Sequence, residues 1–156
     1  MPPSPSGPIP PTVLESQAST RIEPFGRPTP ARVRVLAVLL AAPHALSHAE
    51  IEAAFAPDET PDRVTLYRVL DWLETNGLVH RIASEDRAWR FNASGPDNAG
   101  HAHFHCMHCG QVFCLHALQP AFAFALPPGY ELERAELRLQ GRCPTCAGMK
   151  LAASAV

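Results

Sequence analysis

A chain of 156 residues, 46% of them hydrophobic, is long enough for one domain or two small ones with a real core. Its longest apolar stretch, residues 33–45, contains Arg34 and Pro43 and is too short to cross a bilayer, so we expect no membrane span. A net charge of −2 excludes a diffusely basic surface. Any contact with nucleic acid must come from locally placed arginines, which make up all but one of the 13 Lys and Arg residues.

Prolines are concentrated at the N-terminus, where more than half of the 17 lie in the first 30 residues. This segment has no clear apolar period, which predicts a disordered tail over residues 1–24. The pattern changes at Thr29, which can cap a helix whose first residue is Pro30. Apolar residues then recur at helical spacing until Pro43, where the first helix is expected to stop.

Two further helices are expected before residue 78. Ser47 begins the shorter one, because Glu50 three residues later completes a capping box, and this helix ends before Pro57. The longer one has Thr60 as its cap and ends at Gly77, which suits the left-handed conformation found after helix C-termini. The apolar stripe of this third helix is Leu66, Val69, Leu70 and Leu73.

Two short alternating runs follow, residues 78–82 and 88–91, and the polar turn between them predicts a β-hairpin. Three helices followed by a hairpin are typical of a winged helix-turn-helix, which we expect over residues 25–92. Residues 93–100 have the Gly, Pro and Asn content of a linker and are expected to form a hinge.

The last part, residues 101–150, is expected to be a small α/β domain. Residues 111–115 and 130–139 alternate as strands, and residues 118–126 have the pattern of a short helix. The predicted fold class is therefore α+β, with an N-terminal winged helix-turn-helix and a small C-terminal α/β domain.

Two CxxC pairs in this last part are the strongest chemical signal. The N-terminus lacks the basic and apolar segments of a secretory signal, so we expect a cytoplasmic protein, in which CxxC pairs favour metal over disulfides. Four thiolates can close a tetrahedral shell around Zn²⁺ at roughly 2.3 Å per sulfur, which predicts a structural zinc site. A redox dithiol and small buried hydrophobes are the alternatives. The predicted ligands are Cys106, Cys109, Cys143 and Cys146.

A second set of potential ligands surrounds the first CxxC pair. His101 and His103 are two residues apart, so on a strand they share one face. Cys114, the odd cysteine, follows the pair by five residues and can return to this strand as a neighbour. A His/His/Cys set favours Zn²⁺ over harder ions. A solvated histidine strand and a buried core thiol are the alternatives.

The third expected helix carries a polar face opposite its apolar stripe. Tyr67, Arg68 and Arg63 on this face can bring an arginine to a guanine or phosphate and an apolar surface to a thymine methyl. Arg32, at the head of the first expected helix, and Arg63 are the expected phosphate contacts. A Tyr-Arg pair with no role in DNA binding is the alternative, because such pairs are common on amphipathic helices.

Several segments, in this order and spacing, match one family. They are TPAR at residues 29–32, SHAEI at 47–51, VTLYRVL at 64–70, GLV at 77–79, HAHFHCMHCG at 101–110 and GRCPTC at 141–146. Together they resemble the ferric uptake regulator (Fur) family of metal-dependent repressors. The resemblance implies a winged-helix DNA-binding domain, a C-terminal dimerisation domain, and homodimers that bind double-stranded operator DNA when a regulatory metal is loaded.

The resemblance also implies a regulatory metal site near the hinge. Its two histidines correspond to His101 and His103, a later donor corresponds to Cys114, and His44 is the nearest histidine before the second helix. Asn92 stands where the family usually has a carboxylate or cysteine. Cys114 in place of an acidic residue favours Zn²⁺ as the sensed ion, with Fe²⁺ or Mn²⁺ as the alternatives.

The predicted function is a metal-responsive transcriptional repressor that binds operator DNA as a homodimer, senses zinc and controls metal-uptake genes. It is not expected to be an enzyme, and neither a small-molecule substrate nor a membrane partner is expected. An iron- or peroxide-sensing member of the same family is the first alternative. A zinc-ribbon adaptor or enzyme is the alternative from another class, because its cysteine knuckles look similar.

Overall fold

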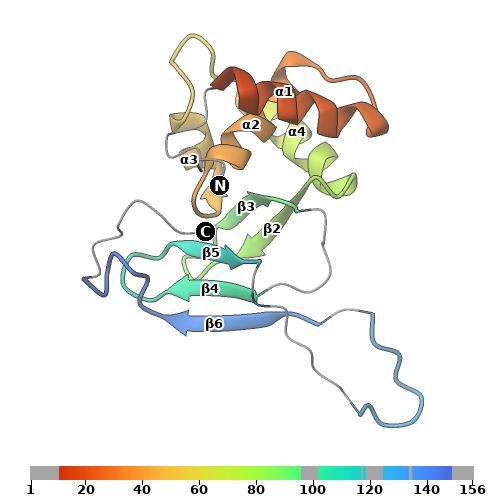
Figure 1. The fold of residues 1–156 in the computed structure, drawn as a ribbon, viewed down its shortest axis with the longest axis vertical. Helices are drawn as coiled ribbons and strands as arrows, with labels where there is room; N and C mark the ends of the chain where they lie inside the picture. Colours follow the sequence, from red (N-terminus) through yellow and green to blue (C-terminus); the bar gives the residue numbers. More distant parts are fainter. Residues whose placement is uncertain (1–10, 96–101, 117, 119–124, 134, 149–156) are drawn as a thin grey trace, which may run out of the picture.

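The computed structural model describes residues 11–95, 102–116, 118, 125–133 and 135–148 (Figure 1). The helices are α1 (Pro11–Ile22), the 3-10 helix η1 (Glu23–Phe25), α2 (Pro30–Ala41), α3 (His48–Ala53) and α4 (Arg63–Thr75). The strands are β1 (Leu46–Ser47), β2 (Val79–Ala83), β3 (Trp89–Ala93), β4 (Ala102–Cys106), β5 (Val112–Leu115) and β6 (Leu137–Gly141). Figure 1 shows the helices on one side of the β2–β3 hairpin and the second sheet on the other. The predicted α+β class is confirmed.

The first two expected helices, α2 and α3, form where their capping residues predict them. The Thr29 hydroxyl accepts a hydrogen bond from the Arg32 N–H, 3.5 Å away, at the start of α2. At the start of α3, the Ser47 hydroxyl accepts from the Glu50 N–H at 3.3 Å. The Glu50 carboxylate in turn accepts from the Ser47 N–H at 2.8 Å, which completes the capping box.

The third expected helix, α4, begins later than predicted. Asp62, not Thr60, is its cap, because the Asp62 carboxylate accepts a 3.0 Å hydrogen bond from the Thr65 N–H. At the other end, Gly77 adopts a left-handed φ of 70°. The Leu78 N–H then bonds back to the Leu73 carbonyl at 2.9 Å, as expected for a glycine after a helix C-terminus.

The prediction of a disordered tail up to residue 24 is wrong for residues 11–24, where α1 and part of η1 form. Leu14, Ala18 and Ile22 are buried, with exposed fractions of 7%, 0% and 0%. They are four residues apart, so they make one narrow stripe that packs against α2. Tertiary packing stabilises a helix that its own sequence only weakly favours.

One hydrophobic core joins the helices to the hairpin. It includes the predicted stripe of α4, side chains of α1 and α2, and Leu78, Val79 and Phe91. The sheet on this core has the order β1-β3-β2, with β3 antiparallel to both neighbours. Helices α2, α3 and α4 followed by this sheet form a winged helix-turn-helix.

The second sheet has the order β5-β4-β6, in which β4 is antiparallel to β5 and parallel to β6. The expected strand over 130–139 is shorter than predicted, because β6 pairs with β4 only from Leu137 to Gly141. The helix expected over residues 118–126 lies mostly outside the described residues. None of the described helices has the length and hydropathy that crossing a membrane requires.

We expect Ile22→Ala to lower the free energy of unfolding by about 2–5 kcal/mol, because Ile22 is fully buried between α1 and the core. Urea denaturation followed by circular dichroism measures the change. Val13→Ala is the matched control, since Val13 lies in the same helix with 42% of its surface exposed. Equal, small effects of the two substitutions would show that α1 does not dock on the core.

Candidate metal sites and nucleic-acid interface

The two CxxC pairs meet at one end of the second sheet. Cys106 ends β4, and its neighbour across the parallel pair is Gly141 at the end of β6, so both knuckles leave the sheet at the same edge. The four cysteine sulfurs lie within 4.8 Å of one another. The sulfurs of Cys109 and Cys143 are 3.9 Å apart. A tetrahedral zinc with bonds of roughly 2.3 Å requires about 3.8 Å between sulfurs, so the quartet fits this ion.

Hydrogen bonds set the acidity of these thiols. The backbone N–H groups of Cys109 and Cys143 point at the Cys106 sulfur and lower the pKa of this thiol to about 5. The Cys143 N–H lies 3.3 Å from that sulfur. A hydrogen bond with the Cys143 sulfur, together with burial, raises the pKa of Cys146 to about 12. Four neighbouring thiolates repel one another, and a divalent cation is what allows all of them to deprotonate.

A second cluster joins three strands. His80 on β2, His103 on β4 and Cys114 on β5 have donor atoms within 4.8 Å of one another. The Nε2 atom of His80 lies 3.3 Å from Nε2 of His103 and 3.3 Å from Sγ of Cys114. On the far side of the ring, His80 Nδ1 lies 3.2 Å from the Ser94 hydroxyl, which fixes the orientation of the imidazole.

The spacing of this cluster also fits a tetrahedral ion. Zinc–nitrogen bonds of roughly 2.0–2.1 Å place two nitrogen ligands about 3.3 Å apart. Burial raises the pKa of the Cys114 thiol to about 11, and a polar contact with the Asn92 side chain partly offsets this. Because a coordinated thiol loses its proton, a divalent cation here would reverse that shift. The three donors leave a fourth position for another ligand.

The second cluster differs from the ligand set expected from the sequence. The structure brings His103 and Cys114 together through the register of β4 and β5, in which they are direct partners. His44 is not in the cluster, because its Nε2 accepts from the Gln111 amide at 3.1 Å and its Nδ1 faces its neighbour's carbonyl. His101 lies outside the described residues. His80 occupies the position that sequence reasoning left open.

His80 had a recognisable signal in the sequence. It alternates with Leu78 and Ile82, both of which are buried, so a histidine stands on the apolar face of a strand. A histidine in such a position needs a polar partner. The nature of that partner depends on what packs against the strand, which the sequence does not contain.

The second cluster lies where the two sheets meet. Ala45, Ile82 and Val112 form a small buried group there, and Cys114 packs against it. The Ala45 N–H bonds to the Val112 carbonyl at 2.8 Å. Next to this group, the Glu85 carboxylate accepts from Gln140 on β6 at 3.2 Å and forms an ion pair with Arg138. The winged helix and the second sheet are thus docked through few contacts.

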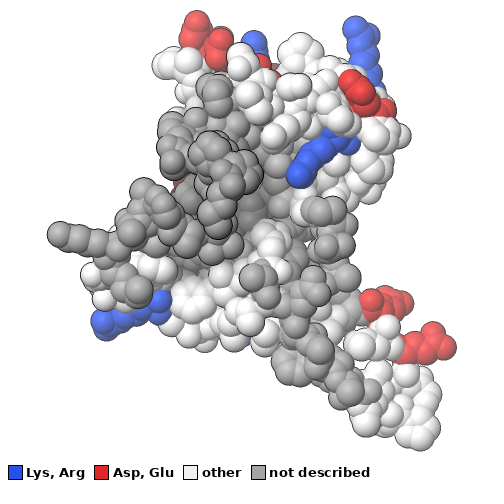
Figure 2. Space-filling model, viewed as in Figure 1, with Lys and Arg blue, Asp and Glu red and all other residues white. Residues whose placement is uncertain are grey.

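The polar face of α4 is exposed as expected. Tyr67 is 50% exposed and Val64 59%, and Arg63 and Arg68 are exposed beside them. Arg63 also lies 3.7 Å from the Glu52 carboxylate. In the view of Figure 2, Lys and Arg side chains are scattered among Asp and Glu and form no continuous basic field. Any contact of this face with DNA must use individual side chains.

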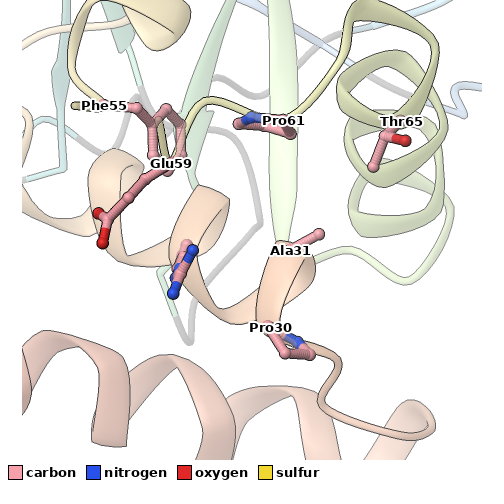
Figure 3. Close-up of a pocket in the computed structure, with 7 residues that line it drawn as sticks. Pro30, Ala31, Phe55, Glu59, Pro61 and Thr65 are labelled. Atoms are coloured by element: carbon pink, nitrogen blue, oxygen red, sulfur yellow. The ribbon is translucent and has the colours of Figure 1, made fainter. Parts of the chain in front are cut away.

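Arg32 is held against α4 and not fully extended into solvent. Its guanidinium lies 3.7 Å from the centre of the Trp72 ring, and it donates to the Arg27 carbonyl at 3.0 Å. A pocket of about 260 Å³ opens nearby, between α2, the segment after α3 and the start of α4 (Figure 3). Its lining contains none of the candidate metal ligands. The lining residues are Pro30, Ala31, Arg34, Phe55, Glu59, Pro61 and Thr65.

A winged helix-turn-helix joined to a small sheet with two candidate metal clusters defines a DNA-binding regulator type of fold. Residues 26–119 match the profile of the ferric uptake regulator family. Over 124 residues the chain is 32% identical to the transcriptional regulator FurA of Mycobacterium tuberculosis (strain ATCC 25618 / H37Rv), covering 78% of this chain and 83% of FurA. FurA of Mycobacterium bovis matches equally. The chain therefore belongs to the ferric uptake regulator family.

Solved structures of this family share the fold. A zinc uptake regulator complexed with zinc and DNA superposes with a TM-score of 0.66 at 23% identity, covering 90% of this chain and 97% of that one. The Helicobacter pylori ferric uptake regulator Fur gives a TM-score of 0.58 at 19% identity, covering 90% and 95%. At these identities the likeness concerns the fold. The family assignment leaves no reason to keep the zinc-ribbon adaptor or enzyme as an alternative.

Proposed function

We propose that this protein is a metal-responsive transcriptional repressor whose homodimer binds operator DNA when zinc occupies the second cluster. The observation that carries the proposal is the convergence of His80, His103 and Cys114 where the two sheets meet. Membership of the family, and relatives named as transcriptional regulators, support the same function.

The position of the second cluster supports a regulatory role. His80 belongs to the winged helix, whereas His103 and Cys114 belong to the second sheet. A shared ion would supply a positive centre that all three donors bind at once. The three side chains then hold the winged helix in one orientation relative to the second sheet, and through it to the partner subunit. A ligand shifts a conformational equilibrium only by its different affinity for the two arrangements.

The donor set supports zinc as the regulatory ion. One thiolate and two imidazoles are softer ligands than the carboxylates that Fe²⁺ and Mn²⁺ accept readily. The alternative is an iron- or peroxide-sensing protein, which the name of the family favours. Replacing the Cys114 thiol by a carboxylate should then move the preference from zinc toward iron.

The cysteine quartet is proposed to hold a separate, structural zinc. Cys106, Cys109, Cys143 and Cys146 fill all four positions of a tetrahedral shell, so this site has no room for a further ligand. It ties the end of β4 to the turn after β6, in a small sheet with little core of its own. Metal binding here contributes directly to folding.

DNA contact is proposed for the exposed face of α4, with Tyr67 and Arg68 at the bases and Arg63 and Arg32 at phosphates. A homodimer doubles these contacts, which matters for a chain with a net charge of −2. The zinc- and DNA-bound relative is a zinc uptake regulator, which makes metal-uptake genes the proposed targets.

Replacing Cys143 by Ser should remove the structural zinc and lower the melting temperature of the protein, because a three-sulfur site binds the ion far more weakly. Metal analysis of the purified variant and thermal denaturation measure both effects. Cys114→Ser is the control, since it leaves the quartet intact. Full zinc content and an unchanged melting temperature in Cys143→Ser would contradict the structural role.

His80→Ala and His103→Ala should each abolish the zinc-dependent gain in DNA affinity, which we expect to be roughly 5- to 150-fold for a coupling of about 1–3 kcal/mol. Fluorescence anisotropy with labelled duplex in zinc-buffered solution measures the gain. His44→Ala is the matched control, because His44 bonds to Gln111 and not to the cluster. A lost response in His44→Ala with a normal response in His80→Ala would reverse the ligand assignment.

Arg68→Ala should weaken operator binding by about 1–3 kcal/mol and reduce the discrimination between operator and random DNA, if Arg68 contacts a base. A contact with phosphate alone would weaken both equally and reduce the dependence of affinity on salt by roughly 0.9 in log–log slope. Competition titrations with both duplexes measure the difference. Arg142→Ala is the control, since Arg142 is exposed on the second sheet, away from α4. Unchanged binding in Arg68→Ala would exclude this face of α4.

A further inference from the structure

The Tyr67 ring on α4 is not free to rotate in solvent, because a histidine covers one side of it. His48, the first residue of α3, has its ring centre 4.2 Å from that of Tyr67, with the two planes tilted by 31°. On its other side, His48 meets the ring of Phe91 edge-on, at 4.9 Å and 80°. Three rings thus run from strand β3 through α3 to the exposed face of α4.

This arrangement anchors the outer ring to the core. Phe91 is buried, with 5% of its surface exposed, and it belongs to the main hydrophobic cluster. His48 is half-buried, and Tyr67 is half-exposed. An exposed tyrosine without such a contact loses rotamer freedom when it binds DNA, and that loss reduces affinity. A ring that is already held loses less.

We propose that His48 is a positioning residue for DNA recognition, which holds the Tyr67 ring in the orientation that contacts the bases. The inference rests on the proposed function, because it assumes that α4 contacts DNA. It adds a residue on α3 that touches no DNA itself and acts through Tyr67.

The charge of His48 supports a role in packing. Burial lowers the pKa of the imidazole; Glu52 on α3 raises it and Arg63 on α4 lowers it, with a net shift below the usual value. The ring is therefore mainly neutral at pH 7 and attracts phosphate little. Removing it should change how Tyr67 is presented without changing the number of phosphates that the protein neutralises.

The test compares His48→Ala, Tyr67→Ala, the double variant and His48→Phe as full-length, zinc-loaded proteins. The probe is a duplex that the wild type selects from a random-sequence pool, with an unselected duplex beside it. His48→Ala should weaken binding to the selected duplex by roughly 2- to 12-fold, equivalent to the 0.5–1.5 kcal/mol of an aromatic pair. The double variant should bind like Tyr67→Ala, and His48→Phe, which keeps a flat ring, should bind within about twofold of wild type.

Two outcomes overturn the proposal while the proposed function stands. If His48→Ala weakens binding equally in the wild-type and Tyr67→Ala backgrounds, the histidine does not act through Tyr67. If its loss reduces the salt dependence by roughly 0.9 in slope, it is a phosphate contact. Thermal denaturation of each variant separates both from unfolding, and His48→Phe provides a folded variant if His48→Ala is unstable. A wild type that selects no duplex at all would overturn the proposed function and this inference with it.

Discussion

The docking of the winged helix on the second sheet is the contact on which both proposed activities depend. It consists of one backbone hydrogen bond, from Ala45 to Val112, a small buried group around Ile82, and the side chains that Glu85 contacts. Exposed ion pairs contribute little stability, and the buried apolar group is small. A contact of this size is weak enough for a shared ligand at His80 to decide between docked and undocked arrangements.

The parts of the molecule that the sequence predicts correctly are those fixed by near neighbours in the chain. The Thr29 cap and the Ser47–Glu50 capping box operate within one helical turn. The apolar stripe of α4 is visible because it repeats over three turns. Helix α1 was missed because Leu14 and Ile22 form a stripe only one residue wide, which becomes stable when α2 covers it. The cap of α4 was misplaced because Thr60 and Asp62 are both good caps, and only the path of the chain selects Asp62.

The candidate sites divide along the same line. The cysteine quartet is readable from spacing alone, because each pair forms its own turn and only the meeting of two turns depends on the fold. The pairing of His103 with Cys114 also follows from a short connection between adjacent strands. His80 could not be assigned, because its partners come from another sheet, and its choice over His44 depends on Gln111 binding the latter.

The distribution of arginines explains why recognition needs side chains that are held in place. With a net charge of −2, the chain cannot rely on long-range attraction to the DNA backbone. Arg32 is stacked on Trp72 and Arg63 lies beside Glu52, so both are restrained before DNA arrives, as Tyr67 is by His48. Restrained side chains lose less entropy on binding, and each contact then contributes more affinity and more discrimination. A protein with few cations on its reading face can therefore remain a weak binder until the metal site aligns two such faces in a dimer.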